Sequence, residues 1–127
     1  MENLQKSHFT FLSSQDGLSL DALLLTPPHP KAVLQIAHGM CEHKERYVPF
    51  MEYMSRSGFA CVIHDHRGHG KSVRRPEDLG YFYENGGAAL VEDLYQLTKE
   101  TKQKFHNLPY FLFGHSMGSF IVRDYIA

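Results

Sequence analysis

The sequence has few cysteines, no long apolar run and no large excess of charge of either sign. Two cysteines among 127 residues, Cys41 and Cys61, are too few for a disulfide framework, and we expect reduced thiols. The formal net charge of −1 indicates neither a nucleic-acid nor an anionic-membrane partner. The apolar stretches are too short to cross a bilayer, and residues 1–6 lack the apolar centre of a signal peptide. These absences predict a soluble, cytoplasmic, single-domain protein.

Hydrophobic patterning predicts a hairpin followed by alternating strands and helices. The turn pair Asp16-Gly17 separates two alternating segments, and two later runs are apolar throughout, as in strands covered on both faces. The expected strands are residues 7–13, 18–25, 32–37, 59–65 and 110–113, and the expected helices are residues 47–54, 88–104 and a segment after 116; residues 71–87, with an exposed aromatic trio at 81–83, are expected to be irregular. This order predicts an α/β fold whose sheet becomes parallel after its first strands.

The segment with the clearest chemistry is Gly114-His115-Ser116-Met117-Gly118, which lies between a predicted strand and a predicted helix. Gly-x-Ser-x-Gly in this context is typical of a nucleophile elbow, in which a strained turn lifts the serine clear of the sheet. Side chains at the two flanking positions would clash, so both are glycine. The pattern therefore predicts that Ser116 is a nucleophile, with the Met117 N–H directed at a developing oxyanion.

A second segment, His38-Gly39-Met40, ends another predicted parallel strand at the same edge of the sheet. Glycine lets the backbone turn there, so the Met40 N–H can pair with that of Met117 to hold an alkoxide. We expect His38 and Gly39, together with His115, to order these loops around the substrate. Cys41 is expected to be a small buried residue.

Three closely spaced histidines, His64, His66 and His69, raise the alternative of a zinc site after the strand at 59–65. Their spacing is similar to the His-x-His-x-Asp-His motif of metallo-β-lactamase-like hydrolases, but Gly68 stands where that family has aspartate. We therefore predict no metal. Instead, we expect Asp65, Arg67 and Ser72 to bond loop amides, with the histidines packed or solvated.

Three motifs in order, at residues 38–43, 65–72 and 114–118, resemble those of the α/β-hydrolase superfamily. Within it they are similar to the branch of monoacylglycerol lipases, lysophospholipases and serine aminopeptidases. The resemblance spans nearly the whole chain. It implies the N-terminal half of that fold: an antiparallel hairpin, a mostly parallel sheet with helices on both faces, and the nucleophile elbow after the fifth strand. It also implies that Ser116 is acylated and that Met40 and Met117 supply the oxyanion amides, with no cofactor.

The α/β-hydrolase chain order is serine, then acid, then histidine, yet no histidine follows Ser116. Asp124 lies two turns along the same predicted helix and is expected to point away from the serine. We therefore expect residues 1–127 to be the N-terminal part of one domain, associated with a C-terminal half that carries a lid, the acid and the histidine. The predicted function is hydrolysis of a lipid-like carboxylic ester through an acyl-enzyme. The alternatives are a catalytically silent binding or assembly module and, less favoured, a zinc hydrolase.

Overall fold

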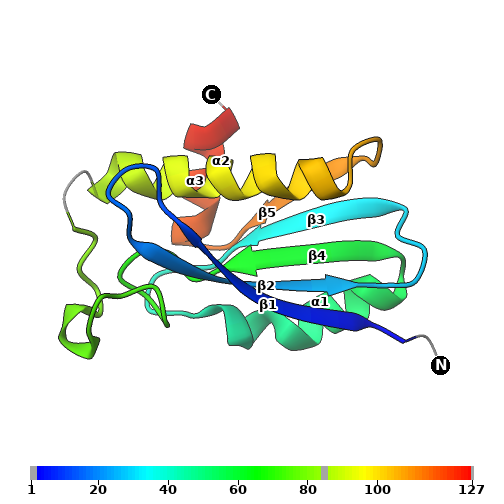
Figure 1. Ribbon diagram of the computed structural model, residues 1–127, viewed down its shortest axis with the longest axis horizontal. Helices are drawn as coiled ribbons and strands as arrows, with labels where there is room; N and C mark the ends of the chain where they lie inside the picture. The colour runs from blue at the N-terminus through cyan, green and yellow to red at the C-terminus, as the bar shows by residue number, and fades with distance from the viewer. Residues whose placement is uncertain (1–2, 84–85, 127) are drawn as a thin grey trace.

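A computed structural model describes residues 3–83 and 86–126. Its centre is one mixed sheet of five strands, in the spatial order β1-β2-β4-β3-β5 (Figure 1). The strands are β1 (Gln5–Leu12), β2 (Ser19–Thr26), β3 (Ala32–Ala37), β4 (Phe59–His64) and β5 (Tyr110–Gly114). β2 runs antiparallel to β1 and β4, whereas β3 runs parallel to β4 and β5. The predicted hairpin and parallel sheet are therefore confirmed.

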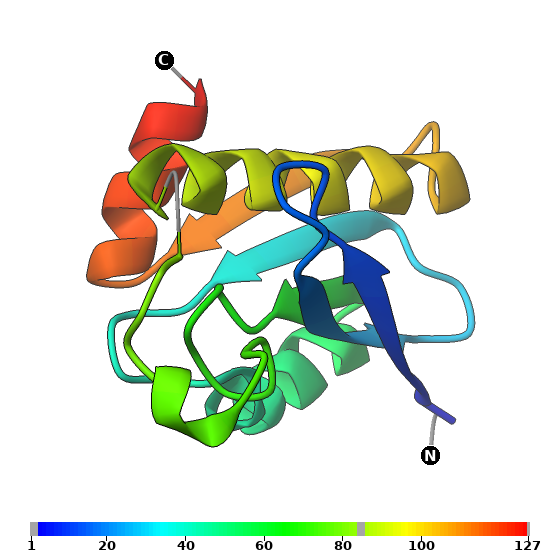
Figure 2. The same ribbon diagram turned by 60° about the vertical axis from the view of Figure 1, so that its left-hand side comes forward.

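Helices cover both faces of this sheet (Figures 1 and 2). A 3₁₀ turn (Lys44–Tyr47) leads into α1 (Val48–Arg56), which packs on one face, while α2 (Gly86–Lys104) and α3 (Met117–Ile126) pack on the other. Alternate residues of β2 serve the two faces, because strand side chains point to opposite sides in turn. Leu23 and Leu25 contact the α1 side, and Leu24 contacts the α2 side.

The central strand β3 is buried at all six positions, as its apolar sequence predicts. Its one polar residue, Gln35, is fully buried yet hydrogen-bonded. The Gln35 amide nitrogen donates to the Leu94 carbonyl at 3.1 Å, and its oxygen accepts from Thr98 and Tyr110. These bonds join β3 to α2 and β5, so the strand that precedes the site is fixed from both sides.

The structure differs from the sequence prediction around residues 71–87. A short 3₁₀ helix (Pro76–Asp78) lies within the segment, and α2 begins two residues before the predicted Ala88. Tyr81 is exposed as predicted, but Phe82 and Tyr83 pack against the core, so the prediction of an exposed trio is wrong for these two. Apolar side chains of this loop pack against the buried clusters of the core. Periodicity does not predict such contacts, because a loop has no repeating pattern.

One end of the sheet carries exposed apolar side chains. Among the described residues, no strand pairs with the outer edge of β5. Phe111 and Phe113 of β5 are 51% and 39% exposed, and Phe120 of α3 is 68% exposed. Within the described ranges, no helix combines the length and apolar character needed to cross a membrane.

Candidate active site

The turn between β5 and α3 holds Ser116 in a strained conformation. Its φ is 58°, in the left-handed region that residues with a side chain seldom adopt. The Gly118 N–H donates to the His115 carbonyl at 3.0 Å, and the Ser119 N–H donates to the Ser116 carbonyl at 2.9 Å. Such strain costs about 1–3 kcal/mol and persists only where the surroundings enforce it. The Ser116 side chain is consequently presented at the surface.

Close backbone packing explains the two glycines around Ser116. A Cβ on Gly114 would lie 2.5 Å from the Gly118 carbonyl oxygen, and a Cβ on Gly118 would overlap the Ala37 carbonyl. The α3 N-terminus therefore sits directly against the end of β3. The Gly-x-Ser-x-Gly pattern predicted this steric requirement, and the structure shows which atoms impose it.

The loop after β3, here called the β3 loop (residues 38–43), touches the turn that carries Ser116. A Cβ on Gly39 would lie 3.2 Å from the Ser116 Cβ and 3.1 Å from the His115 carbonyl oxygen. Met40 follows Gly39, and Met117 is the first residue of α3. Among residues 3–83 and 86–126, no hydrogen-bond acceptor contacts the backbone N–H of Met40 or Met117. Both donors are therefore available to a ligand.

His38 holds the β3 loop from behind. The ring is fully buried, and its Nε2 accepts the His66 N–H at 3.0 Å. Nδ1 is thus the protonated nitrogen, and it donates to the Gly39 carbonyl at 2.7 Å. Burial lowers the pKa of His38 to about 4, so the ring is neutral at pH 7. His38 orders two loops through backbone contacts.

Glu42 braces the β3 loop from the other side, a role that sequence reasoning missed. Its Oε1 accepts the Gly39 N–H at 2.6 Å and the Tyr47 hydroxyl at 2.7 Å, and its Oε2 lies 3.0 Å from the Arg46 Nε. His115 Nδ1 lies 3.7 Å from Oε1. Although burial opposes it, hydrogen bonding from Tyr47 and Gly39 lowers the pKa of Glu42. The only sequence feature that indicates this role is a carboxylate three residues after Gly39.

A fully buried lysine, Lys44, follows the β3 loop directly and anchors its C-terminal end. Lys44 Nζ lies 2.5 Å from Asp21, 2.8 Å from Glu45 and 2.9 Å from Asp65. Although its burial opposes this, the three carboxylates raise the pKa of Lys44. Asp65 also accepts the Lys44 N–H at 2.7 Å and the Lys71 N–H at 3.0 Å, which confirms its predicted bonding to loop amides.

Ser72 also bonds a loop amide, because its carbonyl accepts the Gly68 N–H at 3.0 Å. Its hydroxyl accepts the N–H of Asp21, which lies in strand β2, at 2.9 Å. Arg67 bonds the loop backbone as well, since its Nη1 donates to the Phe82 carbonyl at 3.3 Å, but its main partners are two carboxylates that the prediction did not include. Arg67 is fully buried, and its guanidinium donates to Asp93 Oδ2 at 2.8 Å and to Asp16 Oδ2 at 2.8 Å. The carboxylates are the stronger partners, because a charge-assisted hydrogen bond is about twice as strong as one between neutral groups.

The histidines of the zinc alternative are packed in the interior. His66 Nε2 donates to the His38 carbonyl at 3.0 Å, and His69 Nδ1 lies 3.1 Å from the Arg67 carbonyl. The His64 ring packs edge-on against Phe11, with 5.6 Å between centroids. Within the described part of the chain, no three His, Cys, Asp or Glu side chains are grouped to hold a metal ion.

Two further expectations concern side chains near Ser116. Cys41 was expected to be buried, but it is exposed with φ 62°, so that prediction is wrong. Asp124 is exposed on α3. Among the described residues, no histidine nitrogen hydrogen-bonds to the Ser116 hydroxyl.

The chain is similar in sequence to known proteins. The family described as "Serine aminopeptidase, S33" matches residues 28–127. A monoglyceride lipase from Rattus norvegicus is 34% identical over 121 residues, covering 94% of this chain and 38% of the relative. A monoglyceride lipase homolog from Monkeypox virus is 36% identical over 96 residues, covering 73% of this chain and 32% of the relative. The chain thus spans about a third of the length of these relatives.

The solved structures include a carboxyl esterase from Bacillus coagulans in complex with glycerol. It superposes with a TM-score of 0.89 at 33% identity, covering 97% of this chain and 40% of the esterase. The five-strand order and the helices on both faces are therefore those of the N-terminal half of the esterase fold.

Proposed function

Since the chain belongs to the serine aminopeptidase S33 family and has the α/β-hydrolase fold, we propose that it carries the nucleophile and oxyanion half of a serine carboxylic-ester hydrolase. The observation that carries the proposal is the strained backbone of Ser116, which lies against Gly39 of the β3 loop. A serine raised in this way, with free N–H groups beside it, suits attack on a carbonyl carbon and stabilisation of the resulting oxyanion.

In the proposed reaction, Ser116 attacks the ester carbonyl while a histidine accepts its proton. The Met40 and Met117 N–H groups hold the tetrahedral oxyanion, and removal of one such donor raises the barrier by about 3–4 kcal/mol. The alcohol leaves, and water then releases the acid from the acyl-enzyme. Glu42 and His38 act as positioning residues, because they hold the Gly39 backbone from opposite sides.

The histidine and the acid come, in this proposal, from a C-terminal half of the same fold. Coverage of only 32–38% of the monoglyceride lipases supports this, as does the exposed apolar surface of β5 and α3. A sixth strand beside β5 would cover that surface and satisfy the unpaired edge.

The proposed substrate is a lipid-like ester of the monoacylglycerol or lysophospholipid type. The names of the relatives support this class, and so does a hollow of about 350 Å³ beside the elbow. Its polar lining comes from Glu42, Arg46, Tyr47 and His115, which offer both donors and acceptors to the hydroxyl groups of an alcohol such as glycerol.

The test is an intact mass spectrum before and after treatment with a serine-reactive fluorophosphonate. The expected result is one adduct, absent in Ser116→Ala, together with turnover of a short p-nitrophenyl ester that the same substitution abolishes. A second chain should accompany any labelled sample, because the base is proposed to come from outside residues 1–127.

A catalytically silent binding module is the second candidate, and one observation favours it. No described histidine contacts the Ser116 hydroxyl, so the described chain alone has no base in place. A lone 127-residue mass with no adduct and no turnover would contradict the hydrolase proposal for this chain and support the silent module.

A further inference from the structure

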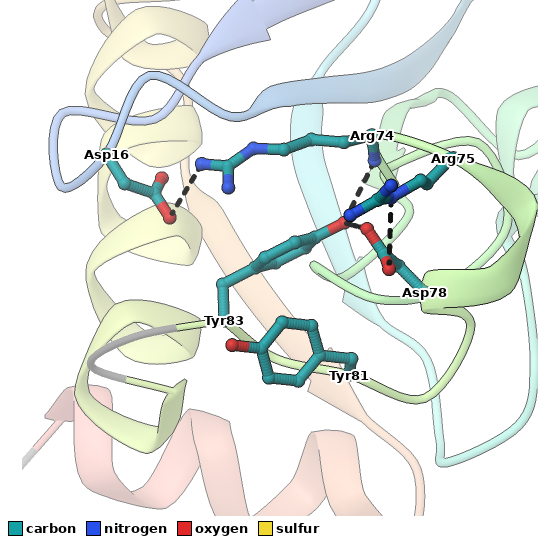
Figure 3. A pocket seen from close by; sticks show the side chains of 6 residues that line it. All are labelled: Asp16, Arg74, Arg75, Asp78, Tyr81 and Tyr83. Carbon is teal, nitrogen blue, oxygen red and sulfur yellow. Dashed lines mark hydrogen bonds and ion pairs between the residues drawn. The ribbon is translucent and has the colours of Figure 1, made fainter.

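A pocket away from Ser116 has a composition that the proposed reaction does not use. It is a hollow of about 330 Å³ between the β1–β2 turn and the segment that follows β4. Figure 3 shows its lining, in which Arg74 reaches toward Asp16 while the Tyr83 hydroxyl meets Asp78. β2 runs antiparallel to β4, so both segments leave the sheet at the edge where β5 ends in the Ser116 turn.

The pocket offers unused hydrogen-bond donors. Arg74 Nη2 lies 3.8 Å from Asp16, and Arg75 Nε lies 3.8 Å from Asp78, which are both beyond hydrogen-bond distance. Among the described residues, neither guanidinium donates a hydrogen bond to a protein acceptor. Two guanidinium groups with free donors match the geometry of a phosphate, which accepts paired hydrogen bonds from such groups.

The two carboxylates in the same pocket are already engaged. Asp16 accepts from Arg67 at 2.8 and 3.1 Å, and Asp78 accepts from the Tyr83 hydroxyl at 2.6 Å. Hydrogen bonding from Arg67, which outweighs burial, lowers the pKa of Asp16, as expected for a carboxylate held by a guanidinium. Part of the acceptor capacity of both carboxylates is therefore used by the protein, and the side chains of Arg74 and Arg75 line the hollow beside them.

Apolar and aromatic side chains next to the arginines favour a lipid surface over a dissolved anion. Leu79 is 60% exposed and Tyr81 is 54% exposed, and the Tyr81 ring lies 4.7 Å from the Tyr83 ring. Arg74 lies over Tyr83 at 4.6 Å. Tyrosine, leucine and arginine together suit the boundary between headgroups and acyl chains. A site for free phosphate needs no exposed leucine.

The same segment reaches the loop that contacts Ser116. Leu79 and Gly80 line a hollow of about 420 Å³ together with Cys41, Glu42 and His43 of the β3 loop. A surface held through Leu79 and Tyr81 would therefore face the edge where an ester would enter. The net charge of −1 indicates no anionic-membrane partner, but it is a sum over the whole chain. Such a sum does not reveal this local pair of arginines.

We propose that the pocket of Arg74, Arg75, Tyr81 and Tyr83 is a docking site for the phosphate headgroup of an anionic phospholipid at a membrane surface. Docking brings the edge of the sheet that carries Ser116 onto the lipid. The inference goes beyond the proposed reaction, because binding to a vesicle needs no turnover.

The test is co-sedimentation of the protein with vesicles of phosphatidylcholine, with and without phosphatidylserine. We expect binding only to the phosphatidylserine vesicles. Arg74→Ala/Arg75→Ala should weaken it by about 25-fold, since each arginine near an anionic surface contributes about fivefold. Lys31→Ala/Arg56→Ala is the matched control, because these cations precede β3 and β4 at the opposite end of the sheet. This control should bind like the unaltered protein.

A charge-conserving variant separates a phosphate pocket from diffuse attraction. Arg74→Lys/Arg75→Lys keeps both charges but loses the planar guanidinium, so binding should fall. Leu79→Ser/Tyr81→Ser should weaken the part of the binding that salt does not remove. Fluorophosphonate labelling of Ser116 should be the same in all variants, which keeps this test independent of the proposed function.

Four results would overturn the docking site. They are equal binding to both kinds of vesicle, equal loss in the control pair, unchanged binding in the lysine variant, and displacement by inorganic phosphate beyond that by sodium chloride at equal ionic strength. The last result would make the pocket a site for dissolved oxyanions.

Discussion

At the scale of single residues, the geometry around Ser116 depends on glycines, which have no Cβ. Glycine at positions 114 and 118 lets the end of β5, the start of α3 and the end of β3 meet, and Gly39 lets the β3 loop approach the serine. The strain at Ser116 is then enforced by packing, so the turn has no freedom to relax. A site of this kind is sensitive to one added methyl group.

Gly118→Ala is therefore expected to destabilise the protein by about 1–3 kcal/mol, because its Cβ would overlap the Ala37 carbonyl and lie 2.8 Å from the His38 carbonyl oxygen. Fluorophosphonate labelling of Ser116 should be lost with it. Urea denaturation measures the free energy of unfolding, and mass spectrometry measures the labelling.

Gly87→Ala is the matched control for that substitution. Gly87 lies in α2 with no atom within 4 Å of an added Cβ, so alanine should leave labelling intact and stabilise the helix by up to about 1 kcal/mol. If Gly118→Ala were as stable and as reactive as Gly87→Ala, the steric account of the turn would be wrong.

At the scale of elements, buried ionisable groups connect the loops that surround the site. His38 joins the β3 loop to the start of the loop after β4, and Lys44 joins the 3₁₀ turn to β2 and Asp65. These links need particular protonation states. His38 must be neutral at Nε2 to accept the His66 N–H, so protonation there would place two donors face to face.

Stability should consequently fall as pH drops from about 6.5 toward 4. Burial lowers the pKa of His38 to about 4 and that of His64 to about 3, whereas the unfolded chain binds these protons near the ordinary value of 6.5. The unfolded state therefore holds more protons in this range, and each group contributes up to about 1.4 kcal/mol per pH unit. Urea denaturation across this range measures the slope.

His64→Leu tests which groups cause that slope. Both ring nitrogens of His64 are buried without a hydrogen-bond partner among the described residues, so leucine removes a titrating group at little cost. The slope should become shallower in this variant. The pKa of the Glu45 carboxyl is lowered from its ordinary value of 4.5 to about 2. Glu45 therefore changes the stability only below about pH 4.5 and does not affect the slope at higher pH. An unchanged slope would count against the buried imidazoles.

Sequence patterns predicted the elements better than the contacts between them. The strand at 32–37 and the elbow strand were predicted within a residue, because apolar runs and Gly-x-Ser-x-Gly report on local structure. The ion pairs of Arg67 and Lys44 and the hydrogen bonds of Glu42 to Gly39 and Tyr47 were not predicted. A charged residue that is buried against carboxylates 20 or more positions away looks like a surface residue in the sequence. The predicted burial of Cys41 and exposure of Phe82 were wrong for a different reason: the packing of loop side chains follows no periodic pattern in the sequence.

At the scale of the whole molecule, the free edge of β5 is the main unsatisfied surface. Phe111 and Phe113 lie on an edge strand that is open in the described structure, and α3 adds Phe120. Such a surface favours association with another strand, whether from a completing half or from a second copy.

Phe111→Lys is expected to reduce self-association of the isolated 127-residue chain, because a charge on an edge strand opposes strand pairing. Light scattering over a concentration series measures the effect. Tyr53→Lys is the control, since Tyr53 is 68% exposed on α1, away from this edge. Equal association of the two variants and the unaltered chain would show that β5 is not the responsible surface.

The ion pairs of Arg67 have a consequence for the order in which the molecule folds. Its two carboxylate partners lie 51 residues before it and 26 residues after it. Closing loops of that size costs entropy that is recovered only when the hairpin and α2 have both reached the sheet. A ribosome must therefore release residue 93 before the segment after β4 can take its final shape. The loops around Ser116 are expected to be among the last parts of the newly made chain to become ordered.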